Sequence, residues 1–97
     1  MIGPGGTLVE MLKDRAVLPA PFEAAAAAGA LNTLKAAALL RGFRGRPPRA
    51  VEALCVAAAR VSRLAVDFRE HIDQMDINPI MVSETTAIAV DVLIKRR

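Results

Sequence analysis

The hydrophobic pattern of this chain changes its period near residue 70, and this change constrains the fold more than any other feature. Between residues 51 and 68 apolar side chains recur at steps of three and four, which predicts an amphipathic helix. From residue 72 onward the period is two, so residues 72–82 and 87–94 are predicted to be strands joined by a loop at 83–86. The apolar positions of the helix are Val51, Leu54, Cys55, Ala58, Val61, Ala65 and Phe68.

The first half of the chain predicts one more helix and one or two short strands. Residues 22–40 are rich in alanine, which has the highest helix propensity, and the alanine run 24–28 suggests a helix packed closely against a sheet. Before it, residues 7–13 and 16–18 have strand-like patterns. The order strand, helix, helix, strand, strand predicts an α+β fold with a small, mostly antiparallel sheet and two helices packed on one face.

The composition is that of a folded protein with a thin core. Apolar residues make up 54% of the chain, which excludes a disordered class, but many are alanines and only 3% of residues are aromatic. Since alanine buries little area, we expect marginal stability or dependence on neighbouring protein. The single cysteine, Cys55, is expected to be a buried thiol.

Charge and hydropathy limit the classes of partner. The net charge of +3 comes mainly from a loop at 41–49, which contains four arginines, and from residues 95–97. Balanced charge elsewhere argues against a nucleic-acid binder, although that loop keeps a small nucleic-acid-binding protein as a third hypothesis. No apolar run approaches the roughly 20 residues that span a bilayer, and the first residues lack a signal peptide. We therefore expect a cytoplasmic protein without membrane contact.

The two C-terminal strands allow their pairing register to be predicted. A hairpin centred between residues 84 and 85 opposes Ile77 to Val92 and Met81 to Ile88, on one continuous apolar face. Because Glu-Thr suits a type I′ turn poorly, we expect a four-residue loop with that centre. A bulge at Pro79, which would shift the pairing, remains an open alternative.

The other face of this hairpin carries two acids and an amide. In the same register Asn78 is directly opposite Asp91, and Asp76 lies on the same face. Opposed Cβ atoms lie about 4.5–5.5 Å apart, so the two side-chain oxygens could share one hard cation such as Mg²⁺. The small residues Ala87 and Ala89 would leave room for a ligand. A solvent-exposed face with ordinary polar residues explains the pattern equally well.

Four segments then occur in a recognisable order, GPGGTLVEMLKD (3–14), GFRGRPP (42–48), MDINPIMV (75–82) and AVDVLI (89–94). Together they resemble the C-terminal part of the ATP-grasp domain of NDP-forming acyl-CoA synthetases. These are the ADP-forming acetate–CoA ligases, which are related to the β-subunit of succinyl-CoA synthetase. The resemblance covers nearly the whole chain, and it implies that residues 1–97 form a single partial ATP-grasp domain.

The resemblance also implies a reaction and roles for the three polar residues. In this family acyl-CoA, phosphate and ADP are interconverted with the free acid, CoA and ATP, through an acyl phosphate and a phosphohistidine. Asn78 and Asp91 would hold Mg²⁺ with ADP or ATP, and Asp76 would be a catalytic acid lining the site. Glu10 matches an acid of the family, but a structural role is at least as well supported.

Other parts of such a synthetase have no counterpart in these 97 residues. We find no phosphate-cradling lysine segment and no CoA-binding unit, and His71 is expected to precede a strand rather than to be phosphorylated. The isolated chain is therefore expected to be inactive, with a partner chain or domain carrying the CoA-binding and phosphohistidine parts. The alternative is a non-catalytic remnant or interaction module that completes or pairs with another chain.

Overall fold

The computed structural model describes residues 1–4, 15–35, 37 and 50–97. The α+β class predicted from the sequence is confirmed, with helices followed by antiparallel strand pairs. Predictions for the strand at 7–13, which includes Glu10, and for the arginine loop at 41–49 lie outside the described residues. The described elements are α2 (Ala24–Asn32), α4 (Val51–Asp67), β1 (Ile72–Ile77), β2 (Ile80–Val82), β3 (Ala87–Ala89) and β4 (Val92–Arg96).

Helix α4 is the amphipathic helix that the sequence predicted. It begins after Ala50, whose N–H donates a hydrogen bond of 2.7 Å to the carbonyl oxygen of Ser83, so the start of the helix is joined to the hairpin loop. Cys55 is buried, as expected, and Ser62 is buried on the same side. No helix in the described part of the chain is long and apolar enough to cross a membrane.

Helix α2 is shorter than the predicted helix over residues 22–40. It ends at Asn32, and the hydroxyl of Thr33 donates a hydrogen bond of 2.7 Å to the carbonyl oxygen of Ala30. Residues 33–35 form turns. Asn and Thr favour helix ends because their side chains compete for backbone hydrogen bonds, so the prediction of a continuous helix is wrong at this point.

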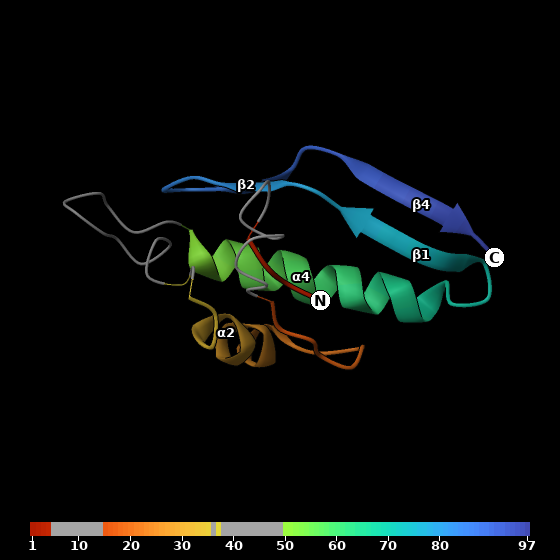
Figure 1. Ribbon diagram of the computed structural model, residues 1–97, viewed down its shortest axis with the longest axis horizontal. Helices are drawn as coiled ribbons and strands as arrows, with labels where there is room; N and C mark the ends of the chain where they lie inside the picture. Colours follow the sequence, from red (N-terminus) through yellow and green to blue (C-terminus); the bar gives the residue numbers. More distant parts are fainter. Residues whose placement is uncertain (5–14, 36, 38–49) are drawn as a thin grey trace.

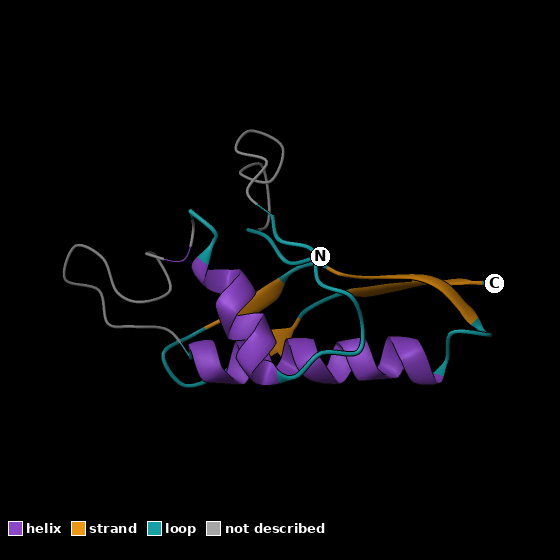
Figure 2. Ribbon diagram, turned by 90° about the horizontal axis from the view of Figure 1, so that it is seen from below, coloured by secondary structure: helices purple, strands orange, loops and turns teal. Residues whose placement is uncertain are grey.

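The buried core lies between the two helices. Figure 1 shows α4 between the paired strands and α2, and Figure 2 shows α2 crossing the N-terminal half of α4. Helix α2 therefore packs on α4 and not on a sheet as predicted, with Ala27 buried and Ala24 and Ala28 against the buried cluster. Small side chains on one helix let the larger apolar groups of the other approach its backbone. The buried cluster consists of Ala27, Leu31, Leu34 and Cys55.

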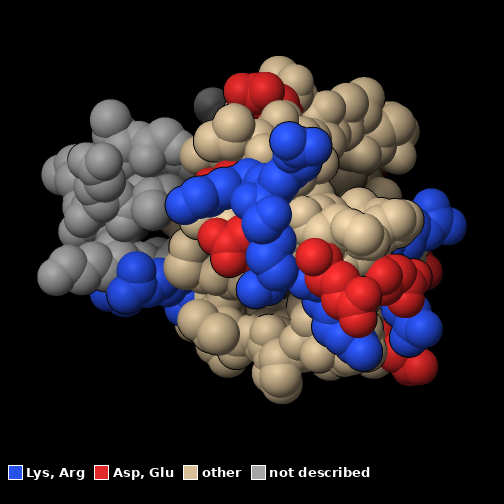
Figure 3. Space-filling model, turned by 90° about the vertical axis from the view of Figure 1, so that its right-hand side faces the viewer, with Lys and Arg blue, Asp and Glu red and all other residues tan. Residues whose placement is uncertain are grey.

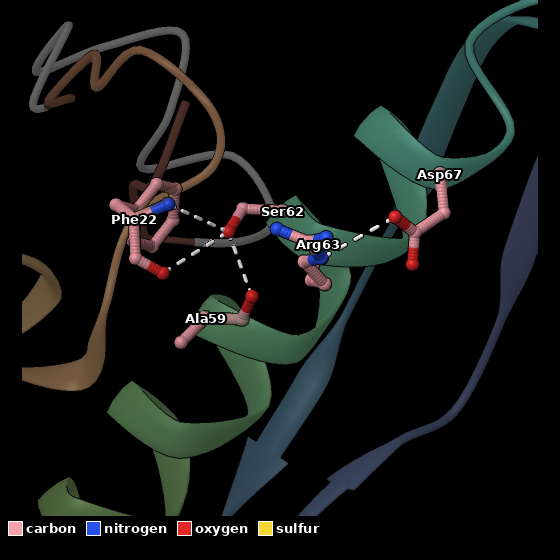
Figure 4. Close-up of polar contacts among 5 residues, drawn as sticks. All are labelled: Phe22, Ala59, Ser62, Arg63 and Asp67. Carbon is pink, nitrogen blue, oxygen red and sulfur yellow. Dashed lines mark hydrogen bonds and ion pairs between the residues drawn. The ribbon is translucent and has the colours of Figure 1, made fainter.

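The N-terminal segment contacts this core in two ways, since Ile2 and Ala16 pack against the buried cluster and Phe22 is hydrogen-bonded to Ser62. Ile2 and Ala16 form an isolated antiparallel bridge with two hydrogen bonds of 2.8 Å, so the predicted strand at 16–18 is reduced to a single bridge. Further along, the N–H of Phe22 donates to the buried hydroxyl of Ser62 at 3.1 Å, and that hydroxyl donates to the carbonyl oxygen of Ala59 at 2.7 Å (Figure 4).

The C-terminal strands form the hairpin in the predicted register. Strand β1 pairs with β4, and β2 pairs with β3, all antiparallel. Ile77 is opposite Val92 and Met81 is opposite Ile88, as expected. The loop at 83–86 has the predicted four residues. It is held by the hydroxyl of Ser83, which accepts hydrogen bonds from the N–H groups of residues 85 and 86 at 3.2 and 3.0 Å.

The hairpin is interrupted at the proline without a change of register. Asn78 and Pro79 separate β1 from β2, because proline has no N–H to donate to a ladder. The N–H of Asn78 nevertheless donates to the carbonyl oxygen of Asp91 at 3.1 Å, and that of Val90 to Pro79 at 3.0 Å. The bulge considered at Pro79 is not formed, and the register shift lies instead between residues 72 and 74.

The buried face of the hairpin changes at this interruption. In β1 Ile77 is half-buried, whereas in β2 the half-buried residues are Ile80 and Val82. Met81 is 60% exposed and its partner Ile88 is 58% exposed. The prediction of one continuous apolar face is therefore wrong beyond Ile77, and on the partner strand Val92 and Ile94 are also exposed, at 46% and 49%. Asn78 and Pro79 lie outside the regular pleat, and they allow the strand to rotate about its axis. The half-buried side chains directly before them are at the odd-numbered positions 75 and 77, and those directly after them are at the even-numbered positions 80 and 82.

Candidate functional site

Asn78 and Asp91 lie opposite each other where the two ladders of the hairpin meet. Both side chains are exposed, and the hydrogen bond from the Asn78 N–H to the Asp91 carbonyl oxygen joins their backbones. The structure thus places the backbones of this predicted pair opposite each other. Their amide and carboxylate groups are exposed to solvent just outside the ends of β1 and β4.

Asp76 lies two residues earlier in β1, opposite Leu93 of β4. Its side chain is exposed, while Met75 and Ile77 on either side of it are half-buried, so its carboxylate is on the outer face of the hairpin. The side-chain amide of Gln74 donates a hydrogen bond of 3.0 Å to Oδ2 of Asp76. Sequence reasoning did not single out Gln74, although the two-residue spacing in a strand was the available signal.

The two alanines expected to leave room beside these residues have different positions. Ala89 is exposed, but Ala87 is half-buried and lines an open hollow of about 640 Å³ between α4 and the hairpin. None of the three predicted site residues lines that hollow, so Ala87 does not belong to their surroundings as predicted. His71 directly precedes β1, as expected, and lines a second hollow of about 350 Å³ at the end of α4.

The oxygen donors of this face fit a partly hydrated hard cation. Mg²⁺ usually takes one or two protein oxygens and completes its shell with water and phosphate oxygens, and Asn78 with Asp91 offers such a pair. In the described ranges no group of three or more His, Cys, Asp or Glu side chains could hold a metal ion by itself. The donor set therefore suits a cation that arrives with a phosphate-bearing ligand rather than a site built of protein alone.

Charges at the end of the molecule that carries the C-terminus are mixed in sign. Figure 3 shows Lys and Arg side chains next to Asp and Glu on this face. Arg63 pairs with Asp67 at 3.3 Å, and Lys95 lies 4.0 Å from Asp73. This face does not present the continuous positive surface that a nucleic-acid backbone requires. The arginines at 41–49, on which that hypothesis rested, lie outside the described residues.

Comparison with protein families and curated proteins gives consistent matches. A family model described as an ATP-grasp domain matches residues 1–95. Subunit β of acetate–CoA ligase [ADP-forming] I from Pyrococcus furiosus is 42% identical over 91 residues, which are 94% of this chain and 39% of that subunit. The 4-hydroxybutyrate–CoA ligase [ADP-forming] of Nitrosopumilus maritimus is 38% identical over 84 residues, or 87% of this chain and 12% of that protein.

Solved structures give the same relationship. The dinucleotide-forming acetyl-coenzyme A synthetase 1 of Ca. Korarchaeum cryptofilum, in complex with coenzyme A and Mg-AMPPCP, matches with a TM-score of 0.91 and 36% identity. A second complex of that enzyme, with coenzyme A, Ca-AMPCP and HgCl⁺, matches with a TM-score of 0.90. The first match covers 98% of this chain but 44% of that one. The chain thus spans less than half the length of these relatives.

Proposed function

The chain belongs to the ATP-grasp domain family, and on that premise we propose that it supplies the Mg²⁺–nucleotide site of an ADP-forming acyl-CoA synthetase of the acetate–CoA ligase type. The observation that carries this proposal is the position of the exposed residue Asn78 opposite the exposed residue Asp91, between the two ladders of the hairpin. The relatives support it, since they are ADP-forming ligases and one was solved with Mg-AMPPCP. The reaction step would be phosphoryl transfer between a phosphohistidine and ADP or ATP.

Each of the three polar residues has a distinct part in this proposal. The amide oxygen of Asn78 and the carboxylate of Asp91 would hold Mg²⁺, which when bound would neutralise charge on the phosphate oxygens of the nucleotide. Asp76 would line the site beside them as a catalytic acid, with its exposed carboxylate available to the phosphoryl group. The backbone hydrogen bond between Asn78 and Asp91 holds the backbones of the two proposed ligands beside each other.

The proposed synthetase is completed by protein outside these 97 residues. A partner chain or domain would carry the CoA-binding and phosphohistidine parts, in keeping with the 39% and 44% of two relatives that the chain spans. We place this assembly in the cytoplasm. The chain by itself contributes one side of the nucleotide site and no site for the thioester, so it should not turn over alone.

A second candidate function is an interaction module without catalysis. It is favoured by the large apolar side chains that the hairpin exposes, since surfaces of this kind often contact other protein. Exposed fractions are 60% for Met81, 58% for Ile88, 61% for Val90 and 69% for Leu93. Such a module would complete or pair with another chain while binding no nucleotide.

A complementation assay separates the two functions. A two-chain ligase of this family, from which the segment matching residues 1–95 has been deleted, is mixed with this chain and assayed for ATP formation from acetyl-CoA, ADP and phosphate. We expect activity from the mixture and none from either component. Asn78→Ala and Asp91→Ala should each lower that activity by about 100-fold or more, because metal-ion stabilisation is worth several kcal/mol.

Glu84→Ala, in the exposed loop of the same hairpin, is the matched control and should restore activity fully. Turnover by the chain without its partner would contradict the proposed division of the site. Equal restoration by wild type, Asn78→Ala and Asp91→Ala would contradict the proposed metal ligands. Stable association with the truncated ligase but no activity would favour the interaction module.

A further inference from the structure

We propose that Gln74 is a positioning residue, which fixes the carboxylate of Asp76 for the metal–nucleotide site, and this inference rests on the proposed function. Nε2 of Gln74 donates a hydrogen bond of 3.0 Å to Oδ2 of Asp76. The bond uses one carboxylate oxygen and leaves Oδ1 available to the site. Gln74 therefore acts through Asp76 and needs no contact with the nucleotide.

The strand geometry explains why Gln74 can fill this position. Side chains two residues apart in a strand lie on the same face, so Gln74 and Asp76 are neighbours on the outer side of β1. Across the ladder Asp76 is opposite Leu93, which has no polar side-chain group to hold a carboxylate. The partner for Asp76 must then come from its own strand.

The nearest basic side chain across the ladder, Lys95, is paired with Asp73 rather than with Asp76. Lys95 is opposite Gln74, but the irregularity between residues 72 and 74 brings the carboxylate of Asp73 to 4.0 Å from the Lys95 ammonium group. Lys95 is thus directed to Asp73. A lysine paired with Asp76 would cancel the negative charge that a metal site uses, whereas the neutral amide of Gln74 restrains the carboxylate and leaves its charge intact.

An exposed carboxylate without a partner samples several rotamers, and ordering it on metal binding costs conformational entropy. A hydrogen-bond donor that orders it beforehand removes part of that cost. Loss of the hydrogen-bond partner of a metal ligand lowers metal affinity by about 10–100-fold in characterised sites. Asp76 lines the proposed site without being one of its two metal ligands, and Gln74 and Asp76 are both exposed, so we expect a smaller effect.

Mn²⁺ is a suitable probe, because it broadens the NMR signals of nearby backbone amides and reports even weak binding. The full 97-residue chain, labelled with ¹⁵N, is titrated with Mn²⁺ as wild type, Gln74→Met, Asp76→Ala and the double variant. Methionine keeps the length of the side chain but removes the donor. We expect Gln74→Met to weaken Mn²⁺ binding by about two- to fivefold, because the charge of Asp76 acts from beside the two metal ligands. It should add nothing to Asp76→Ala, since the two act as one unit.

Glu84→Gln is the matched control, because it removes one exposed negative charge from the loop of the same hairpin and leaves both the bond to Asp76 and the Lys95–Asp73 pair in place. Its effect should be smaller than that of Gln74→Met. If Gln74→Met acted by disturbing the fold in general, it would weaken Mn²⁺ binding by the same factor in the wild type and in Asp76→Ala. An additive double variant, or a Gln74→Met chain that binds like wild type, would overturn the inference.

A second measurement needs no metal. Three-bond couplings to Cγ of Asp76 should show one dominant χ1 rotamer in the wild type and averaging in Gln74→Met. Averaged couplings in both chains would also overturn the inference. Failure of the proposed function looks different, since Asn78→Ala and Asp91→Ala would then leave Mn²⁺ broadening unchanged. If Asn78→Ala and Asp91→Ala abolish the Mn²⁺ broadening while Gln74→Met has no effect, the proposed function stands and only the role of Gln74 is contradicted.

Discussion

At the scale of single residues, Ser62 is the buried polar side chain of the described part of the chain, with 5% of its surface exposed. Its hydroxyl accepts a hydrogen bond from Phe22 and donates one to Ala59, so both functions of the group are used. A buried hydroxyl is tolerated only when it is bonded in this way. Ser62 therefore fastens the segment before α2 to the middle of α4.

Ser62→Ala should lower the free energy of unfolding by about 1–2 kcal/mol, because the N–H of Phe22 loses its acceptor in a partly buried position. Urea denaturation followed by circular dichroism measures this change. Thr33→Val is the control, since the Thr33 hydroxyl is exposed and bonds only to a carbonyl within its own turn. Its cost should stay within about 0.5 kcal/mol. Equal losses in the two variants would show that the contact with Phe22 contributes little.

At the scale of elements, the hairpin keeps one pairing register, but the face that is half-buried differs between β1 and β2. The ladders on either side of Pro79 keep the same pairing, yet Met75 and Ile77 are half-buried in β1 while Met81 is exposed in β2. The exposed side of β1 carries Asp76. Residues that the primary structure would assign to one apolar face thus lie in different environments.

This difference predicts unequal costs for the same substitution at two places. Ile77→Thr should lower the free energy of unfolding by about 1–2 kcal/mol, because a half-buried side chain loses apolar contacts and gains a hydroxyl. Ile88→Thr should cost less than about 0.5 kcal/mol, since Ile88 is 58% exposed. Threonine is β-branched like isoleucine, so strand propensity changes little. If urea denaturation showed that both substitutions lower the free energy of unfolding equally, the prediction of a single continuous apolar face would be supported instead.

The element scale also shows what the sequence could and could not predict. The register followed from the loop centre, because each antiparallel pair is fixed once the turn is fixed, and so the opposition of Asn78 and Asp91 was predictable. The change of face was not, since strict alternation fails where Pro79 interrupts the pleat. The end of α2 at Asn32 depended on local capping by Thr33. The bond from Gln74 depends on side-chain rotamers, which spacing does not specify.

At the scale of the whole molecule, the core is small and one face of the hairpin is open. The buried apolar residues of the described part are mostly small, and the strands contribute none of them. This agrees with a chain that spans 39% of one relative and 44% of another. The two helices enclose the buried cluster, and the hairpin exposes its polar residues. The buried apolar residues are Ala27, Leu31, Leu34, Ala37 and Cys55.

The most direct test of the central claim is calorimetric titration of the chain with ADP, with and without Mg²⁺, for wild type, Asn78→Ala and Asp91→Ala. We predict that binding requires Mg²⁺ and that each substitution weakens it by about tenfold or more, since each removes one of two protein ligands to the cation. Glu84→Ala should bind like wild type. Absence of Mg²⁺-dependent binding, or binding that neither substitution changes, would contradict a metal–nucleotide site at Asn78 and Asp91.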